Sequence, residues 1–108
     1  MKKGDICFVD LSSGIGHEQH GIRPAILVSE SIAGMVLVLP LTTNLEALRF
    51  PYTLSIIESS INNLEQNSAV LIFQIKSIDK HRLGKKIGSL SSGDLKKIDS
   101  QMKKMLRL

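Results

Sequence analysis

The sequence of 108 residues has few aromatic side chains and a single cysteine: it contains no tryptophan, one tyrosine and three phenylalanines. One cysteine cannot form a disulfide within the chain, and its place in the alternating run Ile6–Val9 predicts a buried, small apolar side chain. Long apolar runs are also missing, because the longest, Met35–Leu39, is far shorter than the roughly 20 residues of a membrane-spanning helix. Gly4 and Asp5 follow the first lysines, a pattern that no signal peptide tolerates. We therefore expect a soluble, cytoplasmic protein.

Neither sign of charge dominates the sequence. Fourteen basic and ten acidic residues give a formal net charge of +4, with a pI near 9.4. This balance is compatible with a polyanionic partner without requiring one, because the lysine pairs near the two chain ends are equally compatible with a solvated surface. A hydrophobic content of 43% excludes a wholly disordered chain. The length allows one core, so we expect one domain over residues 1–108.

Short apolar segments bounded by Gly, Ser, Asn or Pro predict strands over most of the chain. The connection Ser31–Gly34 is short enough to join the second and third segments as a hairpin. The expected strands cover residues 5–10, 24–29, 35–41, 51–56, 68–75 and 84–90.

The last segment has the pattern of an amphipathic helix. Ser91 followed by Asp94 resembles a capping box with a shorter carboxylate. Beyond it, apolar residues recur at helical spacing while lysines cover the other face. Several short strands followed by one helix predict a mainly β, α+β fold, a small antiparallel barrel with the helix packed across it. The apolar helix positions are Leu95, Ile98, Met102, Met105 and Leu106.

Arg23 stands where a polar, glycine-bracketed loop turns into the apolar strand at 24–29. A guanidinium stays charged and offers five donors, so a rigid position facing an open groove suits it to hold phosphate. The next strand ends in hydrogen-bonding side chains, and hairpin pairing would bring Arg23 near Thr42. A salt-bridged arginine beside a turn of threonines is the alternative. The polar residues at that strand end are Thr42, Thr43 and Asn44.

The loop before Arg23 carries His17, Glu18, Gln19 and His20. Its histidines lack the helical i, i+4 spacing of zinc proteases, and the third histidine, His81, belongs to a distant segment, so we expect no metal site. Exposed loop histidines are one interpretation. A role in proton transfer or substrate contact is the other, because imidazole titrates near neutrality.

Two further segments give weaker signals. Arg49 precedes Phe50, Pro51 and Tyr52, and single-stranded nucleic acid binds by stacking on aromatics beside cations. The same aromatic residues also fit a barrel core. The segment 78–83 carries charges of both signs and is typical of a solvated turn.

Together these stretches resemble the MazF/PemK (Kid) family of bacterial toxins, the ribonuclease half of type II toxin–antitoxin modules. The similarity extends from residue 4 to about residue 99, and its most specific parts are Gly16–Ala25 and Gln74–Leu83. It implies an SH3-like barrel with a C-terminal helix, a homodimer, and metal-independent cleavage of single-stranded RNA, chiefly mRNA, without a cofactor. It also implies inhibition by an antitoxin whose partly disordered tail fills the RNA groove. Other matching pieces are Gly4–Ile6, Val9–Leu11, Pro40–Thr42 and Ser68–Leu71.

The resemblance also implies roles for individual residues. In family members the residues matching Arg23 and Thr42 carry catalysis, and those matching Glu18 and Gln19 border the RNA. Attack by the ribose 2′-OH on its own phosphate leaves a 2′,3′-cyclic phosphate and a 5′-OH, and preorganised donors stabilise the developing charge. Arginine is a poor general base, so Glu18 and the loop histidines stay open as proton acceptors. The expected substrate-binding residues are His17, Glu18, Gln19, His20, Thr43, Asn44 and Gln74.

The sequence departs from the family pattern at His20, where relatives often carry a small residue, and in the short linker at 31–34. Both differences bear on RNA specificity rather than on the fold. Two other functions remain as alternatives. One is a gyrase poison like the CcdB toxins, although their terminal tryptophan is absent here; the other is an inactive barrel that only binds nucleic acid or antitoxin.

Overall fold

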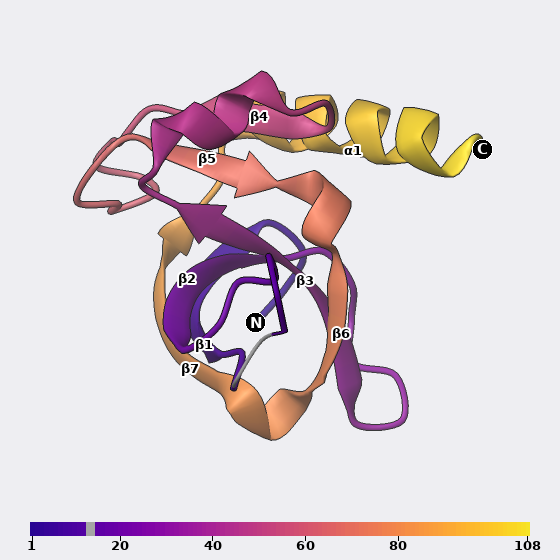
Figure 1. The fold of residues 1–108 in the computed structure, drawn as a ribbon. Coiled ribbons are helices and arrows are strands. Elements are labelled where there is room, and N and C mark those ends of the chain that lie inside the picture. Colours follow the sequence, from indigo (N-terminus) through magenta and orange to yellow (C-terminus); the bar gives the residue numbers. More distant parts are fainter. Residues whose placement is uncertain (13–14) are drawn as a thin grey trace.

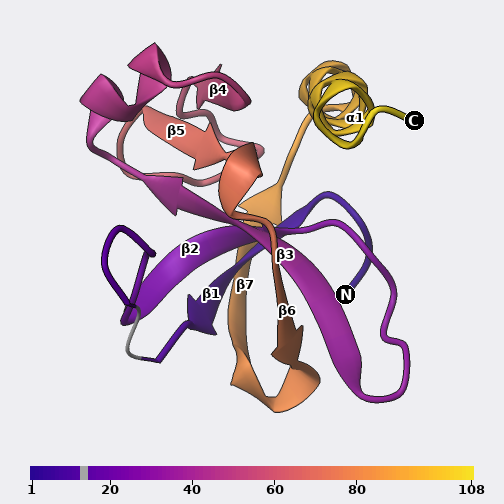
Figure 2. The ribbon, with the colours of Figure 1, turned by 45° about the vertical axis from the view of Figure 1, so that its right-hand side comes forward.

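Within residues 1–12 and 15–108, which the structure describes, the computed structural model has seven strands, three 3-10 helices and one α-helix (Figures 1 and 2). The 3-10 helices are η1 (Leu45–Arg49), η2 (Ile72–Gln74) and η3 (Lys80–Arg82), and the α-helix is α1 (Ser92–Leu106). The strands are β1 (Asp5–Asp10), β2 (Ile22–Leu27), β3 (Met35–Thr42), β4 (Thr53–Ile56), β5 (Ser68–Leu71), β6 (Lys76–Asp79) and β7 (Leu83–Ser89).

All strands pair antiparallel, in the order β4-β5-β3-β2-β1-β7, and β6 pairs with the first half of β3. The sheet therefore branches at β3 and curves into the ring seen in Figure 1, with α1 lying across one end. The expected mainly β fold with a C-terminal helix is confirmed. The ring is not closed by hydrogen bonds, however, because among the described residues no ladder joins β6 to β7. The short η3 connects those two strands instead.

The predicted strand 68–75 is wrong in its second half. The chain leaves β5 after Leu71, makes the single turn η2, and resumes pairing at Lys76 in β6. β5 and β6 pair with the same edge of β3 in different registers. From Val70 to Lys76 the chain advances six residues while β3 advances three, from Leu41 to Val38, so the chain must leave the sheet between β5 and β6. A continuous apolar run carries no sign of such a turn.

Smaller differences occur at other strand ends. β2 begins and ends two residues before the expected 24–29, β4 begins at Thr53 rather than 51, and β7 covers 83–89. The hairpin prediction at 31–34 is confirmed, since Ile32 and Met35 exchange two backbone hydrogen bonds of 2.9 Å. Ala33 and Gly34, with φ of 51° and 81°, give the primed turn that matches strand twist.

Strands β1 to β3 are each buried on both faces over part of their length, at Asp5–Cys7, Ala25–Leu27 and Val38–Thr42. Ile6 of β1 points to a core between the sheet and α1, and its neighbour Cys7 points to a second core inside the ring. The first core contains Ile6, Ile26, Leu39, Leu41, Ile56, Leu64, Val70, Ile72, Leu90 and Ile98. The second contains Cys7, Val9, Leu11, Ala25, Leu27, Val36, Val38 and Ile78.

Helix α1 forms where the sequence predicts it. The Ser91 hydroxyl caps its start by accepting from the Asp94 N–H at 3.1 Å, and Ile98 is fully buried in the first core. Leu95, Met102 and Met105 pack around that core, but Leu106, expected on the apolar face, is largely exposed. In the part of the chain that the structure describes, no helix is long and apolar enough to cross a membrane.

Asp5 joins the N-terminal segment to β7 through a buried carboxylate that is only 2% exposed. Burial by itself would raise its pKa. Hydrogen bonds from the Lys2 N–H (2.8 Å) and Ser89 Oγ (3.2 Å), with the Lys86 ammonium at 3.3 Å, outweigh burial and hold the pKa of Asp5 below its ordinary range.

Burial raises the pKa of the Cys7 thiol, and the Asp5 charge acts in the same direction. Cys7 is therefore the inert core residue that the sequence predicts.

The packing of β7 predicts the effect of a methyl group at Gly88. A Cβ there would lie 2.5 Å from the carbonyl oxygen of Asn62, whose backbone is fixed by side-chain hydrogen bonds to Ile57 O (2.9 Å) and from Leu64 N (3.0 Å). We expect Gly88→Ala to lower the free energy of unfolding by about 1–3 kcal/mol, as overpacking does. Urea titration measures this change.

The matched control is Gly93→Ala in the first turn of α1, where a Cβ meets nothing closer than Ser91 Oγ at 4.0 Å. Alanine favours helix, so this variant should be neutral or more stable by up to about 1 kcal/mol. Equal midpoints for the two variants would contradict the close packing at Gly88.

The Asp5 site predicts an acid-sensitive contribution to stability. A carboxylate whose pKa is lower in the folded state stabilises it above the unfolded value, ordinarily 3.8, and loses this effect as pH falls through the folded pKa. The difference in unfolding free energy between wild type and Asp5→Asn should thus be largest near neutral pH and shrink below about pH 4. Urea titrations across this range measure it, and a difference independent of pH would refute the assignment.

Candidate functional site

Arg23 and Thr42 lie at the same end of the β2–β3 ladder. The pairing that the sequence predicts is confirmed, with Ala25 opposite Pro40. Continuing this register by two residues brings Arg23 opposite Thr42, on the face that Ala25 and Pro40 share, because side chains alternate along a strand. The structure thus supports the predicted neighbourhood of a cation and a hydroxyl.

Arg23 is half-buried and is held by the backbone. Its Nε donates to the carbonyl oxygen of His20 at 2.8 Å. Among the described residues no carboxylate lies within 4.0 Å of its guanidinium, so the alternative of a salt-bridged arginine is not seen. The two terminal nitrogens keep their donors for an anion such as phosphate.

Thr42 is 9% exposed at the last position of β3. Its Oγ1 accepts from the Asn44 N–H at 3.1 Å, and Asn44 Oδ1 in turn accepts from Glu46 N at 3.2 Å to cap η1. Because Oγ1 acts as the acceptor, the Thr42 hydroxyl proton remains available to a ligand. Asn44 therefore caps η1, in addition to the contact with substrate that the sequence predicts for it.

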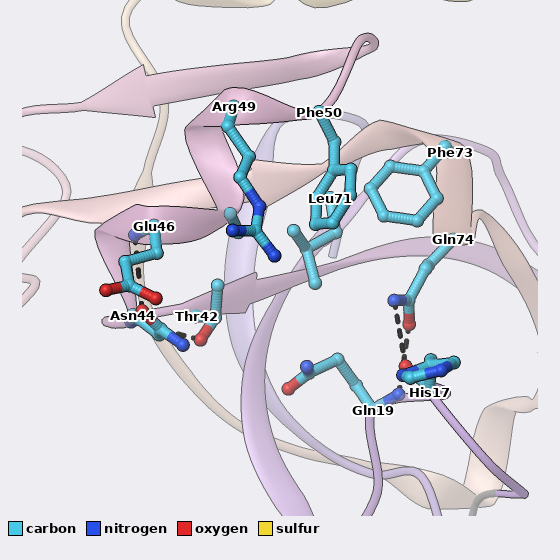
Figure 3. A pocket seen from close by; sticks show the side chains of 11 residues that line it. His17, Gln19, Thr42, Asn44, Glu46, Arg49, Phe50, Leu71, Phe73 and Gln74 are labelled. Carbon is cyan, nitrogen blue, oxygen red and sulfur yellow. Dashed lines mark hydrogen bonds between the residues drawn. The ribbon is translucent and has the colours of Figure 1, made fainter.

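A cavity of about 520 Å³ opens beside Thr42 (Figure 3). Its walls come from the β1–β2 loop, the end of β3, and the helical turns η1 and η2, so segments far apart in sequence meet there. It is lined by His17, Gln19, Thr42, Asn44, Glu46, Ala47, Arg49, Phe50, Leu71, Phe73 and Gln74. A smaller cavity of about 310 Å³ shares the walls Gln19, Phe73 and Gln74, and adds Glu18 and Lys76.

The side-chain amide of Gln74 contacts the loop backbone at two points. Its Oε1 accepts from the Gln19 N–H at 3.0 Å, and its Nε2 donates to His17 O at 3.2 Å (Figure 3). The Gln19 side chain points into the cavity, and its Oε1 is buried with no hydrogen-bond partner among the described residues. A buried acceptor of this kind is ready for a donor from a ligand.

Two aromatic rings form one rim of the cavity. Phe50 (46% exposed) and Phe73 (41% exposed) stand edge to face with centroids 6.0 Å apart, and the Arg49 guanidinium lies 5.0 Å from the centroid of Phe50. The sequence indicated Phe50 beside Arg49, but Tyr52 packs against the first core. Phe73 was missed, because it lies in the run expected to be a buried strand, and η2 turns it outward.

The remaining predicted residues are not all at this cavity. Thr43 lines a different cavity with Phe8, Pro24 and Lys85, and His20 is exposed with its Nδ1 3.5 Å from Glu18 O. No three His, Cys, Asp or Glu side chains of the described residues gather closely enough to hold a metal ion.

The 78–83 segment is mostly exposed, as a solvated turn should be. There Asp79 accepts from the backbone N–H of His81, which lowers the pKa of this carboxyl, and its Oδ1 also lies 2.8 Å from His81 Nδ1.

Comparisons with known proteins agree with this geometry. The family described as "PemK-like, MazF-like toxin of type II toxin-antitoxin system" matches residues 2–106. Endoribonuclease EndoA of Bacillus subtilis (strain 168) is 31% identical over 112 residues, covering 100% of this chain and 96% of the relative. Endoribonuclease MazF of Staphylococcus saprophyticus is 32% identical over 104 residues, covering 93% and 86%.

Solved structures share the fold over the whole chain. MazF (Form-I) from Deinococcus radiodurans superposes with a TM-score of 0.82 at 20% identity, covering 100% of this chain and 97% of that one. A mycobacterial endoribonuclease in complex with its cognate antitoxin gives a TM-score of 0.75 at 22% identity, covering 100% and 96%.

Proposed function

The chain belongs to the PemK-like, MazF-like toxins of type II toxin–antitoxin systems and is an endoribonuclease, and we propose that it cleaves single-stranded RNA at Arg23 and Thr42. The observation that carries this proposal is a guanidinium with no carboxylate partner among the described residues, which the β2–β3 register, continued by two residues, sets opposite a hydroxyl that lines the cavity. The target is mRNA cut at short sequence motifs, which stops translation and growth.

The reaction needs neither metal nor cofactor in this proposal. The ribose 2′-oxygen forms a bond to phosphorus as the bond from phosphorus to the 5′-oxygen breaks, which leaves a 2′,3′-cyclic phosphate and a 5′-OH. Arg23 donates to the phosphoryl oxygens through its terminal nitrogens, and the Thr42 hydroxyl supplies a further donor. Groups that are already oriented toward such charge are each worth about 3–4 kcal/mol of barrier.

One proton must leave the 2′-OH and another must reach the 5′-oxygen. Glu18, His17 and His20 are the candidates for this transfer on the same loop. His17 lines the cavity beside Thr42, and Glu18 lines the smaller cavity that adjoins it. The His20 ring is exposed. We place His17 first for the proton transfer because of its position in the cavity.

The rim of the cavity suits unpaired bases. Phe50 and Phe73 offer exposed ring faces with Arg49 beside them, and base stacking on aromatics contributes about 1–3 kcal/mol per base. The free Oε1 of Gln19 suits a donor from a base or a ribose. The amide of Asn44 keeps two donors for the substrate after its oxygen caps η1.

The same groove is the site proposed for a protein inhibitor. One solved relative is described as an endoribonuclease in complex with its cognate antitoxin. Another is described as a MazE-MazF crystal structure. For this chain we propose a cognate antitoxin whose partly disordered tail occupies the groove, and a homodimer in which two grooves adjoin. Sedimentation at micromolar concentration reports the dimer directly.

Cleavage without metal is the first test. Purified protein is incubated with a single-stranded RNA in excess EDTA, and we expect cleavage to 2′,3′-cyclic phosphate ends. Arg23→Ala should lower the rate at least about 10²-fold, because it removes the main charge donor. The matched control is Arg107→Ala at the exposed C-cap of α1, which should keep full activity.

Three results would overturn the proposal. Loss of activity in EDTA with recovery on adding a divalent ion would contradict metal independence. Full activity in Arg23→Ala would contradict its role, and RNA binding without cleavage by the wild type would favour the inactive barrel.

The loop histidines are tested by the pH dependence of the rate. If an imidazole takes part in proton transfer, log kcat plotted against pH has a limb near neutrality. Replacing His17 and His20 together by glutamine should abolish that limb, and the single variants assign it to one ring. A profile that keeps its shape in the double variant would leave Glu18 as the proton acceptor.

A further inference from the structure

We propose that Gln74 is a positioning residue for RNA cleavage: its amide fixes the 16–21 loop, and through that loop it fixes Arg23 and Gln19. The inference rests on the proposed function, since its kinetic consequence requires that Arg23 act on phosphate. It changes the role predicted for Gln74 from contact with substrate to control of the residues that make that contact.

Gln74 binds the loop as a neighbouring strand would. Its side-chain amide forms two hydrogen bonds with backbone groups two residues apart: it accepts from the Gln19 N–H at 3.0 Å and donates to the His17 carbonyl at 3.2 Å. These contacts bridge 55 and 57 residues of sequence, so they are tertiary and not a local turn. Both polar atoms of the amide face the loop in Figure 3.

The amide projects from a rigid base. Gln74 ends η2, whose first residue, Ile72, is fully buried in the first core. The turn is closed by the Ile75 N–H to Ile72 O (3.1 Å) and tied to the start of β4 by Phe73 N–H to Tyr52 O (3.3 Å). Because η2 is anchored in the first core, the Gln74 side chain fixes the position of the loop relative to that core.

Among the described residues, Gln74 gives the hydrogen bonds that reach the backbone of residues 17–19 from outside the loop, while Glu18 N donates to Ile15 O at 3.2 Å within it. Gly21 N donates to Ser12 O at 2.8 Å and Leu11 N to Gly21 O at 2.9 Å, which closes the base of the loop. Gly16 and Gly21 both have positive φ, of 60° and 75°, a conformation that glycine adopts without strain. Gln74 holds the middle of that stretch.

Arg23 is linked to the clamp through one further residue. The carbonyl of His20, directly after Gln19, accepts from Arg23 Nε at 2.8 Å. A shift of the 17–19 backbone therefore moves the acceptor that orients the guanidinium, and it moves the Gln19 side chain in the cavity as well. A misplacement of 1 Å costs a reaction of this type about 10²-fold in rate.

The test compares three variants with the wild type in steady-state cleavage of a short RNA with one cleavage site. Gln74→Leu removes both hydrogen bonds at similar volume. Gln74→Glu keeps the acceptor for Gln19 N–H but loses the donor to His17 O until the carboxyl is protonated. Gln101→Leu is the matched control, because the Gln101 amide also bridges to a backbone carbonyl, Thr53 O at 3.0 Å, and among the described residues it makes no hydrogen bond to the 16–21 loop.

We expect Gln74→Leu to lower kcat about 10²-fold while KM changes by less than about threefold. Gln74→Glu should be impaired near neutral pH and regain activity relative to wild type as pH falls toward about 5, because the protonated acid restores the missing donor. Amide exchange at Gln19 should accelerate in Gln74→Leu, whereas Gln101→Leu should keep both the wild-type kcat and the wild-type exchange rate at Gln19.

A change confined to KM would mean that Gln74 contacts RNA directly, and an unchanged kcat or an unchanged Gln19 exchange rate would equally overturn the clamp. Unfolding midpoints of all variants show whether a loss of activity is a loss of fold, and the pH rescue of Gln74→Glu is independent of that question. If the wild type shows no Arg23-dependent cleavage, the proposed function fails, while the exchange measurement still reports whether the clamp exists.

Discussion

The branch of the sheet at β3 is the constraint on which the rest of the structure depends. β3 shares hydrogen bonds with β2 on one edge, and on the other edge first with β6 and then with β5. β5 and β6 run along this edge in the same direction, but their pairing positions are separated by three more residues than the matching positions on β3. A regular strand cannot absorb these residues, so the chain leaves the sheet after Leu71, and η2 brings Phe73 and Gln74 to the cavity that Thr42 lines. The cavity is thus a consequence of strand pairing as well as of the residues that line it.

The charged groups at the two ends of the β1–β2 pair differ in how completely they are paired. At one end the Asp5 carboxylate is buried, and the donors around it satisfy it, including Lys86 at 3.3 Å. Such an arrangement contributes to stability because each partner is matched. At the other end Arg23 is oriented by a neutral carbonyl and has no carboxylate partner among the described residues. A carboxylate there would bind the guanidinium more strongly, but it would compete with the phosphate. The incomplete pairing of Arg23 leaves its terminal nitrogens available to an anion, as the proposed function requires.

Local signals in the sequence were sufficient for the helix, its cap at Ser91, the primed hairpin at 31–34 and the pairing of β2 with β3. Each depends on residues within a few positions of one another or on one short connection. The turn at 72–74 depends instead on the distant partners of β5 and β6, so the apolar run gave the wrong answer there. Phe73 was lost for the same reason. Thr43 lines a different cavity from Thr42, because adjacent residues at a strand end point to opposite faces, and the sequence did not show which face carries which cavity.

The use of backbone groups to orient Arg23 also bears on the unusual residue at position 20. The guanidinium is held by the His20 carbonyl, and the Gln74 amide hydrogen-bonds to the backbone of His17 and Gln19. None of these contacts uses the side chains of His17 or His20, so these side chains can vary without disturbing the position of Arg23. An imidazole at position 20 is therefore compatible with the proposed catalytic pair. A loop fixed through its backbone can change which bases it contacts while the position of Arg23 stays the same.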